Sequence, residues 1–150
     1  MSYREIVKIG DPILQKKSRK VEKFDEKLSR LIDDMKETMY KAEGVGLAAV
    51  QVGVLRRVVV MDIGEGFMEL VNPEIIAQEG EQTAQEGCLS LPGQYDTTLR
   101  PAEVKVQAQD RTGKWHIYKG TELKARCFCH EIDHLDGILF TQRVVHEDNS

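Results

Sequence analysis

The sequence predicts an α+β fold in which antiparallel or mixed β-sheets pack around a central helix. An early segment has the apolar spacing of an amphipathic helix, short β-branched or alternating segments follow, and a second helical segment comes last. Two main helices around such strands are typical of the α+β class. Residues 1–150 contain no internal repeat or low-complexity linker, so we expect a single domain with a polar tail at about residues 145–150.

Two helical signals open the chain. Asp11 and Pro12 are typical of a capped helical turn, because proline is tolerated at the first helical position. An apolar stripe then predicts a helix over about residues 25–42, and Gly44 and Gly46 are expected to end it. The stripe consists of Phe24, Leu28, Leu31, Ile32, Met35 and Met39.

Short strands are predicted through the middle of the chain. Residues 57–62 are rich in β-branched side chains, and a strand over residues 67–71 follows a glycine-containing turn. Apolar and polar residues alternate over residues 103–108, which indicates a half-buried strand. The turn residues 110–113 come next, so residues 115–118 are predicted as the hairpin partner of that strand.

Composition and charge exclude several classes of protein. Hydrophobic residues make up 41% of the chain, and no stretch approaches the roughly 18 apolar residues of a membrane helix. The net charge of −4, with the two signs interspersed, argues against broad binding to nucleic-acid phosphates. The N-terminus lacks a signal-peptide core and the three cysteines form no disulfide pattern, so we expect a cytoplasmic protein.

The last predicted helix, from about Thr121 to Gly137, is the expected central helix and carries the strongest functional signal. His130 and His134 stand one turn apart on the same face, so both imidazole rings can reach one metal ion. Glu131 lies beside them and can take a proton from metal-activated water. A chance match that includes the glutamate is improbable in a chain with four histidines, so the pattern predicts a catalytic metal site.

A catalytic metal of this kind usually has a third protein ligand, and elimination favours Cys88. Phe140 stands where the metzincin pattern would place another histidine, and too little chain follows His134 for a distant glutamate. Cys127 precedes His134 by a helical rise of about 10 Å, which metal–ligand bonds cannot comfortably span. Cys129 points off the face, so these two cysteines are interpreted as packing residues. Cys88 is expected at a strand end beside a glycine.

The glycine-rich segment at residues 44–49 superficially matches a dinucleotide-binding fingerprint. Such a motif must follow a strand and open a helix, whereas this one follows a helix, and Asp62 comes too early for a ribose-binding acid. Two interpretations stay open: a helix stop, or a loop that offers backbone groups to an extended substrate. Gln51 is a surface residue under the first interpretation and an amide donor under the second.

Three segments occur in order along the chain: Gly44-x-Gly46-x-Ala48-Ala49-x-Gln51, Glu86-Gly87-Cys88-Leu89-Ser90 and His130-Glu131-x-x-His134. Together they resemble the peptide deformylases, a family that removes the formyl group from the N-terminal methionine of new proteins in bacteria and organelles. The likeness runs from about Val7 to Arg143.

The resemblance implies a role for each matched residue. Cys88, His130 and His134 bind the metal, and Glu131 carries the proton from water to the leaving amine. Gln51 and the backbone N–H of Leu89 stabilise the oxyanion, a type of contact typically worth about 3–4 kcal/mol. The implied substrate-binding residues are Val45 and Gly46 for the substrate backbone, and Val45, Leu123, Cys127 and the aliphatic part of Glu86 for the methionine side chain.

The resemblance also implies a cofactor and partners. The cofactor is one divalent metal ion, expected to be Fe²⁺, with Zn²⁺, Ni²⁺ or Co²⁺ able to substitute. The partners are N-formylmethionyl nascent chains and a transient ribosome contact, with no membrane and no sequence-specific nucleic-acid binding. The chain stops soon after Val145 without the long terminal helix that some bacterial members use at the ribosome, so we expect docking by that route not to apply.

Several residues depart from the family pattern. Arg126 stands where many relatives have an apolar residue at the methionine pocket, so it is expected to affect the pocket. Tyr95 takes a position that is a substrate-contacting arginine in some relatives, and Cys129 replaces a frequent glutamine. Arg100 and Glu43 are interpreted as a structural ion pair.

Three alternatives to a deformylase stay open. A non-enzymatic domain with a structural zinc would need His116 or Cys127 as a fourth ligand, and it would leave Glu131 without a task. A metallopeptidase that cuts within chains would act on unformylated peptides. A thiol enzyme with Cys88 as its nucleophile would stay active after chelation.

Overall fold

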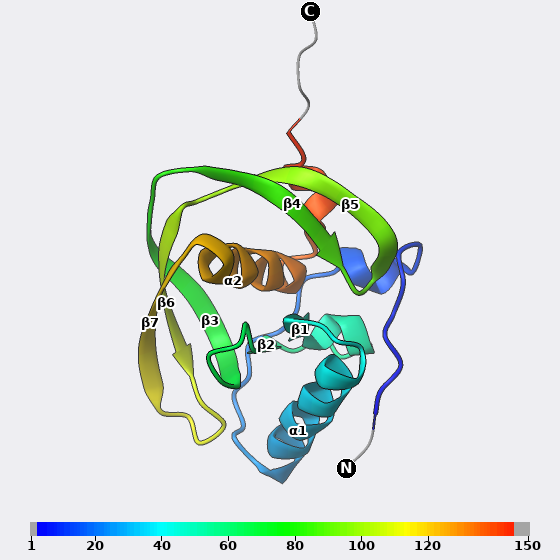
Figure 1. Ribbon diagram of the computed structural model, residues 1–150. Coiled ribbons are helices and arrows are strands. Elements are labelled where there is room, and N and C mark those ends of the chain that lie inside the picture. Colours follow the sequence, from blue (N-terminus) through cyan, green and yellow to red (C-terminus); the bar gives the residue numbers. More distant parts are fainter. Residues whose placement is uncertain (1–2, 146–150) are drawn as a thin grey trace, which may run out of the picture.

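The computed structural model describes residues 3–145 and has two β-sheets and two long helices (Figure 1). The larger sheet is antiparallel throughout, with the strand order β1-β2-β3-β6-β7. Its strands are β1 (Gly46–Ala48), β2 (Val58–Met61), β3 (Met68–Glu79), β6 (Glu103–Gln109) and β7 (Trp115–Thr121). A separate antiparallel hairpin consists of β4 (Gln82–Cys88) and β5 (Leu91–Arg100).

The two helices lie on either side of strands β1 and β2. Figure 1 shows α2 (Glu122–Leu135) between the β4–β5 hairpin and these strands, with α1 (Glu26–Lys41) beyond them. Three short 3-10 turns complete the described chain: η1 (Pro12–Gln15), η2 (Ala49–Val52) and η3 (Phe140–Arg143). The predicted α+β fold with a central motif-bearing helix is confirmed. Among the described residues, no helix is long and apolar enough to span a membrane.

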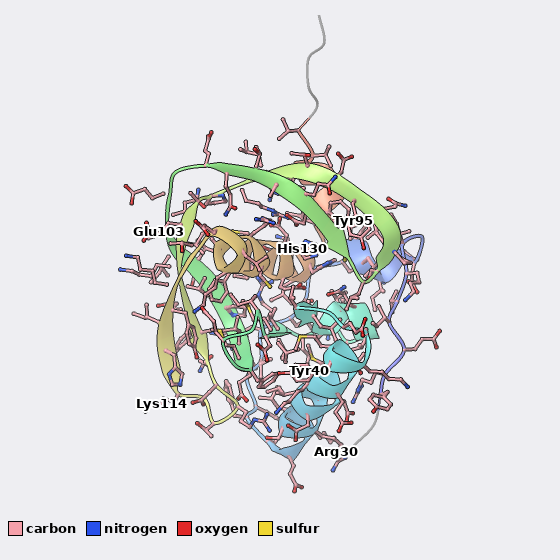
Figure 2. The ribbon with its side chains drawn as sticks, viewed as in Figure 1. Arg30, Tyr40, Tyr95, Glu103, Lys114 and His130 are labelled. Carbon is pink, nitrogen blue, oxygen red and sulfur yellow. The ribbon has the colours of Figure 1, made fainter. Side chains whose placement is uncertain are left out.

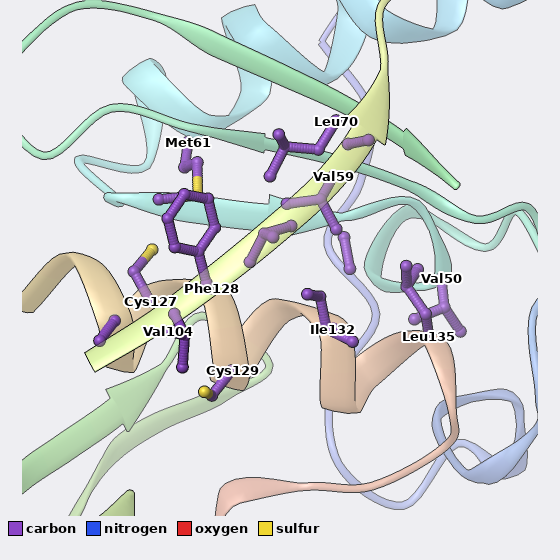
Figure 3. Close-up of a cluster of buried hydrophobic side chains, with 14 residues drawn as sticks. Val50, Val59, Met61, Leu70, Val104, Cys127, Phe128, Cys129, Ile132 and Leu135 are labelled. Atoms are coloured by element: carbon purple, nitrogen blue, oxygen red, sulfur yellow. The ribbon is translucent and has the colours of Figure 1, made fainter. Parts of the chain in front are cut away.

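The run of apolar residues in β2 follows from burial on both faces of the strand. Successive side chains point to opposite faces, so Val58 and Val60 pack with α1 while Val59 and Met61 pack with α2. Figure 3 shows Val59 and Met61 together with Phe128 in the cluster between the sheet and α2. This core fixes the position of α2, which carries the candidate site.

Helix α1 confirms the predicted stripe but ends differently from the prediction. The Asp25 side chain caps its start by accepting from the Leu28 N–H at 3.1 Å. At its end, Glu43 takes the left-handed conformation with φ 56°, and the Gly44 N–H donates to the Met39 carbonyl at 2.9 Å. Gly44 therefore takes part in ending the helix, as predicted, whereas Gly46 does not. The last helical residue is Lys41, and Gly46 begins β1.

The end of α2 explains why a glycine follows it. Thr121 is its N-cap residue, as predicted, and the helix stops at Leu135. Gly137 then takes φ 75°, and a Cβ atom there would lie 2.4 Å from the carbonyl oxygen of Gln15. No side chain fits that position without moving the backbone of the N-terminal segment.

The predicted strands near residues 57–62, 103–108 and 115–118 are confirmed, and the strand begun at 67–71 extends to Glu79. The capped turn at Asp11 is confirmed by η1. The β4–β5 hairpin was predicted only as a strand end at Cys88. Its buried side chains include Glu86, Thr98 and Arg100, so it carries no apolar alternation. Of the expected polar tail, residues 146–150 lie outside the described residues.

Candidate metal centre

The candidate ligands come from two elements that meet across the core. His130 and His134 project from the same face of α2, and Cys88 ends β4 directly opposite them. The two Nε2 atoms lie 3.2 Å apart, and Cys88 Sγ lies 3.2 Å from His134 Nε2. All three ligand atoms lie within 4.8 Å of one another. The sequence-predicted ligand set is therefore assembled in the fold.

This geometry fits a single transition-metal ion. Tetrahedral bonds of about 2.1 Å to nitrogen and about 2.3 Å to sulfur separate neighbouring ligand atoms by about 3.3–3.6 Å. Two of the three observed separations, at 3.2 Å each, are close to that range, and the third lies within 4.8 Å. A thiolate with two imidazoles is a donor set that suits iron, zinc, nickel and cobalt. Within residues 3–145, these three residues form the only group of this kind.

A carboxylate orients the first histidine. Glu86 accepts a hydrogen bond from His130 Nδ1, which leaves the Nε2 lone pair of His130 pointing toward the other two ligands. The Glu86 carboxylate also accepts from Thr98 Oγ1 at 2.7 Å and from Arg100 Nη2 at 2.6 Å. The sequence suggested only the aliphatic part of Glu86 as functional. Its charged end holds the candidate ligand His130 in place.

Arg100 joins the hairpin to α2. Its guanidinium forms a buried pair with Glu86 on β4 and a partly buried pair with Asp133 on α2. The expected ion pair between Arg100 and Glu43 is therefore wrong. Glu43 lies instead at the rim of a cavity beside the metal centre. Arg143 contributes an outer contact to Asp133 at 3.1 Å.

The electrostatics of the site follow from burial and close charges. Burial alone raises the pKa of Glu86, but hydrogen bonds from His130 and Arg100 outweigh it and lower the pKa to about 2. Burial, and then the charge of His130, lower the pKa of His134 well below its usual value. Burial lowers the pKa of His130 as well, but the charge of Glu131 and contacts with Cys88 and Glu86 raise it to about 10.

Glu131 is buried beside the ligands and faces β1. A Cβ atom on Gly46 would lie 2.5 Å from Glu131 Oε2, so the Glu131 carboxylate can occupy this position only because residue 46 is a glycine. Glu131 Oε1 has no hydrogen-bond partner among the described residues. Burial raises the pKa of Glu131 to about 7, with His130 acting in the opposite direction. A buried carboxylate with that pKa can both accept and release a proton near neutrality.

Gln51 is held as an amide donor, which supports the second interpretation of the glycine-rich segment. Its Oε1 accepts from the Ala48 N–H at 2.9 Å, so its Nε2 turns toward the site. That nitrogen lies 3.2 Å from Ser90 Oγ and 3.5 Å from Cys88 Sγ. Gln51 is fully buried and so is not a surface residue.

An open cavity of about 410 Å³ gives access to the metal centre. Leu89 lies on its wall in the turn between β4 and β5, directly after Cys88. Tyr95 lines the same cavity from β5 and is 68% exposed. Figure 2 shows Tyr95 on the hairpin and His130 on the helix. Val45 and Gly46 also line it, and Gly46 lies against Glu131.

A smaller cavity of about 130 Å³ adjoins the site. It is lined by Val45, Gln85, Glu86, Gly87, Leu123, Arg126, Cys127, His130 and Glu131. These include every residue that the resemblance assigns to the methionine pocket. Cys127 is buried, and its Sγ contacts the carbonyl oxygen of Val45 at 3.7 Å. Burial raises the pKa of the Cys127 thiol well above its usual value.

The other candidate ligands lie apart from the metal group. Cys129 is buried in the core between α2 and the sheet, as expected for a packing residue. Burial raises the pKa of its thiol to about 11. His116 is on β7 and pairs with Asp110 at 2.8 Å. Neither His116 nor Cys127 belongs to the described metal group, so nothing supports a closed four-ligand zinc site.

Sequence reasoning missed the residues that support the ligands. Thr98, Arg100 and Asp133 form the network behind Glu86, and Ser90 helps to position Gln51. One signal could have found the main support: a metal-binding histidine needs a partner for its second nitrogen, and Glu86 lies two residues from Cys88.

A three-ligand Cys-His-His site with an adjacent buried carboxylate, carried by an α+β fold, defines a metal-dependent hydrolase. A family model described as polypeptide deformylase matches residues 3–150. The peptide deformylase of Alkaliphilus metalliredigens is 56% identical over 147 residues, which is 98% of this chain and 100% of the relative. That of Acetivibrio thermocellus is 59% identical over 145 residues, which is 97% of this chain and 85% of the relative.

Solved structures agree with these sequence relatives. The crystal structure of peptide deformylase from Thermotoga maritima has a TM-score of 0.94 at 42% identity, and the match covers 97% of this chain and 99% of that one. The enzyme from Ehrlichia chaffeensis in complex with actinonin also has a TM-score of 0.94, at 41% identity over 97% of this chain and 90% of that one. The chain belongs to the polypeptide deformylase family. It is a metallo-hydrolase that removes the formyl group from nascent peptides.

Proposed function

We propose that Cys88, His130 and His134 hold one divalent metal ion and that Fe²⁺ is the native ion. The observation that carries this proposal is the convergence of the three ligand atoms within 4.8 Å, with Glu131 buried beside them. Zn²⁺, Ni²⁺ or Co²⁺ can take the same donor set. When bound, the metal supplies a Lewis acid that lowers the pKa of water and polarises a carbonyl oxygen.

The formyl oxygen of the substrate is held by two protein donors in this proposal. Gln51 Nε2 is oriented toward the site by the Ala48 contact to its oxygen, and the Leu89 N–H follows the ligand Cys88 in the β4–β5 turn. Donors that are already in place stabilise the negative charge that develops on this oxygen without reorganisation.

Glu131 transfers the proton. It accepts a proton from the attacking water as the water oxygen bonds to the formyl carbon, and it gives that proton to the amine nitrogen as the C–N bond breaks. The products are formate and a free N-terminus. The burial of Glu131 between α2 and Gly46 keeps its carboxylate within the site during both transfers.

The two cavities place the rest of the substrate. Val45 and Gly46 on the wall of the larger cavity pair with the substrate backbone, and Tyr95 contacts the residues that follow. The smaller cavity receives the methionine side chain against Val45, Leu123 and Cys127. The proposed substrates are N-formylmethionyl chains in a bacterial cytoplasm. A transient ribosome contact stays a prediction.

The test is formate release from a formyl-Met tripeptide by protein prepared without oxygen and loaded separately with Fe²⁺, Ni²⁺, Co²⁺ or Zn²⁺. We expect rapid, chelator-sensitive release, with Fe²⁺ found in protein purified anaerobically from its own cells. An unformylated tripeptide is the control, and its cleavage would instead indicate a peptidase. Absence of release from folded, metal-loaded protein would overturn the proposal.

A further inference from the structure

Arg126 places a guanidinium in the wall of the smaller cavity. On α2 and near β1, the cavity is also lined by the apolar or small side chains of Val45, Leu123 and Cys127 and by the ionisable His130 and Glu131. An arginine in the wall of a pocket for an apolar side chain is costly unless its donors are satisfied, because an unpaired buried donor loses its hydration.

The donors of Arg126 are only weakly used within the protein. Its Nη1 lies 3.4 Å from the Gln85 carbonyl oxygen and its Nη2 lies 3.3 Å from Gln82 Oε1, both long for a charge-assisted hydrogen bond. Its buried Nε has no partner, and Arg126 makes no ion pair with any described residue. A guanidinium has five N–H donors, so several remain for a ligand.

The carboxylates that line the cavity limit the charge of a substrate side chain that could accept hydrogen bonds from Arg126. Glu86 and Glu131 line the same cavity, so a substrate side chain with a negative charge would meet two acids there. A neutral side chain with a strong acceptor oxygen meets no such repulsion. Methionine sulfoxide has the length of methionine and carries one such oxygen on its sulfur.

We propose that Arg126 is a specificity-determining residue that lets this enzyme deformylate chains beginning with formyl-methionine sulfoxide as well as formyl-methionine. This inference rests on the proposed function, in which the smaller cavity receives the first side chain. The guanidinium donates to the sulfoxide oxygen, and hydrolysis itself is unchanged: water adds to the formyl carbon and the C–N bond breaks. The two epimers at the sulfoxide sulfur place their oxygen differently, so the site discriminates between them.

The experiment measures kcat/KM of the metal-loaded enzyme for formyl-Met, formyl-norleucine and the two separated formyl-methionine sulfoxide tripeptides. We expect the preferred epimer to react within about tenfold of formyl-Met. In R126L, the ratio of sulfoxide to methionine kcat/KM is expected to fall about 10- to 100-fold, the range of a hydrogen bond to a charged group, and epimer discrimination is expected to disappear. R126K, which keeps a donor, should recover part of the ratio.

Lys124→Leu is the matched control, because Lys124 is a cation on the same helix that does not line the cavity. It should leave the ratio and the epimer preference as in the unchanged enzyme. If R126L leaves the ratio of sulfoxide to methionine kcat/KM unchanged, or if the sulfoxide peptides react more than 100-fold more slowly than formyl-Met, the role of Arg126 is overturned and the proposed function is not. No hydrolysis of formyl-Met or formyl-norleucine would instead overturn the proposed function. Metal content and thermal unfolding confirm that each variant is folded and loaded.

Discussion

At the scale of single residues, each reactive group depends on a neighbour that holds it in one orientation. Glu86 fixes the tautomer and direction of His130, and the Ala48 N–H turns the Gln51 amide so that its nitrogen faces the metal centre. Glu131 is positioned differently. Its Oε2 occupies space that a side chain at Gly46 would fill, and its Oε1 has no hydrogen-bond partner among the described residues. Conservative substitutions at these positions should therefore change metal content and turnover to different extents.

The substitution Glu131→Gln is expected to keep the metal and lose most of the turnover. Glutamine has nearly the same shape, so the ligand geometry is retained, but it cannot accept the proton from water. The loss should be about 10²- to 10⁴-fold in kcat, the usual range for general acid–base catalysis. Formate release and metal content per chain measure the two effects. Turnover equal to that of the unchanged enzyme would remove Glu131 from the mechanism.

Gly137→Ala is expected to destabilise the fold at the end of α2. The new Cβ would lie 2.4 Å from the Gln15 carbonyl oxygen, and alanine at φ 75° is strained in any surroundings. Gly53→Ala is the control, because Gly53 has φ 82° and open space around its Cβ direction. The strain at Gly53 should cost about 1 kcal/mol of the free energy of unfolding, and Gly137 about 1–3 kcal/mol more. Equal thermal shifts for the two variants would contradict this account.

At the scale of elements, the polar network joins the β4–β5 hairpin to α2. Arg100 on β5 contacts Glu86 on β4 and Asp133 on α2, so one guanidinium ties three elements together. The hairpin carries Cys88 and the helix carries both histidines, which means that the network sets the distance between the two halves of the metal centre. Packing of apolar side chains does the same for α2 and the larger sheet (Figure 3).

Arg100→Met is expected to weaken both the fold and the metal centre. It leaves Glu86 buried without its cation, while the partly buried Asp133 keeps Arg143. Breaking a buried pair in this way typically costs about 3–5 kcal/mol of the free energy of unfolding. Loss of support behind a ligand should also lower metal affinity by about 10- to 100-fold. Denaturant unfolding and competition with a chromophoric chelator measure the two effects.

Arg143→Met is the control for this prediction, because Arg143 contacts the same Asp133 from a more exposed position. An exposed ion pair is worth about 0–1 kcal/mol, so that variant should stay close to the unchanged protein in both measurements. Similar effects of the two substitutions would argue against a special role for the buried arginine.

At the scale of the whole molecule, the proposed metal ion would link segments that are far apart in the chain. Cys88 and His134 are 46 residues apart and belong to different layers of the fold. A ligand that binds only the folded state raises the free energy of unfolding by mass action. The metal is therefore expected to be a structural support as well as the catalytic centre.

Removal of the metal with a chelator is accordingly expected to lower the Tm and to abolish formate release together. With the metal at about 1,000 times its dissociation constant, binding contributes about 4 kcal/mol. Each kcal/mol corresponds to roughly 2–4 °C in a chain of this size. Calorimetry before chelation, after it and after adding Ni²⁺ back checks the prediction. If the Tm does not change on chelation, Cys88, His130 and His134 do not bind a metal tightly.

What could be determined from the sequence alone was largely local. The stripe of α1 and the pairing of His130 with His134 follow from the helical repeat, which places residues three or four apart on one face. Cys88 was reached by excluding the other ligand candidates and by family resemblance, and both routes agree with the fold. The glycine-rich segment stayed ambiguous until the Ala48–Gln51 contact showed which way the amide faces.

Only the tertiary structure decided the long-range polar contacts. Arg100 was expected to pair with Glu43 and pairs instead with Glu86 and Asp133, because the hairpin folds over α2. The buried side chains of the β4–β5 hairpin include Glu86, Thr98 and Arg100, so its strands lack the alternation of apolar and polar residues that predicts a strand. The hairpin and its polar network could therefore not be predicted from the hydrophobic pattern of the sequence. Spacing along the chain determines which side chains share a face. Which faces then meet depends on packing between distant segments, and the support of the metal centre was decided at that level.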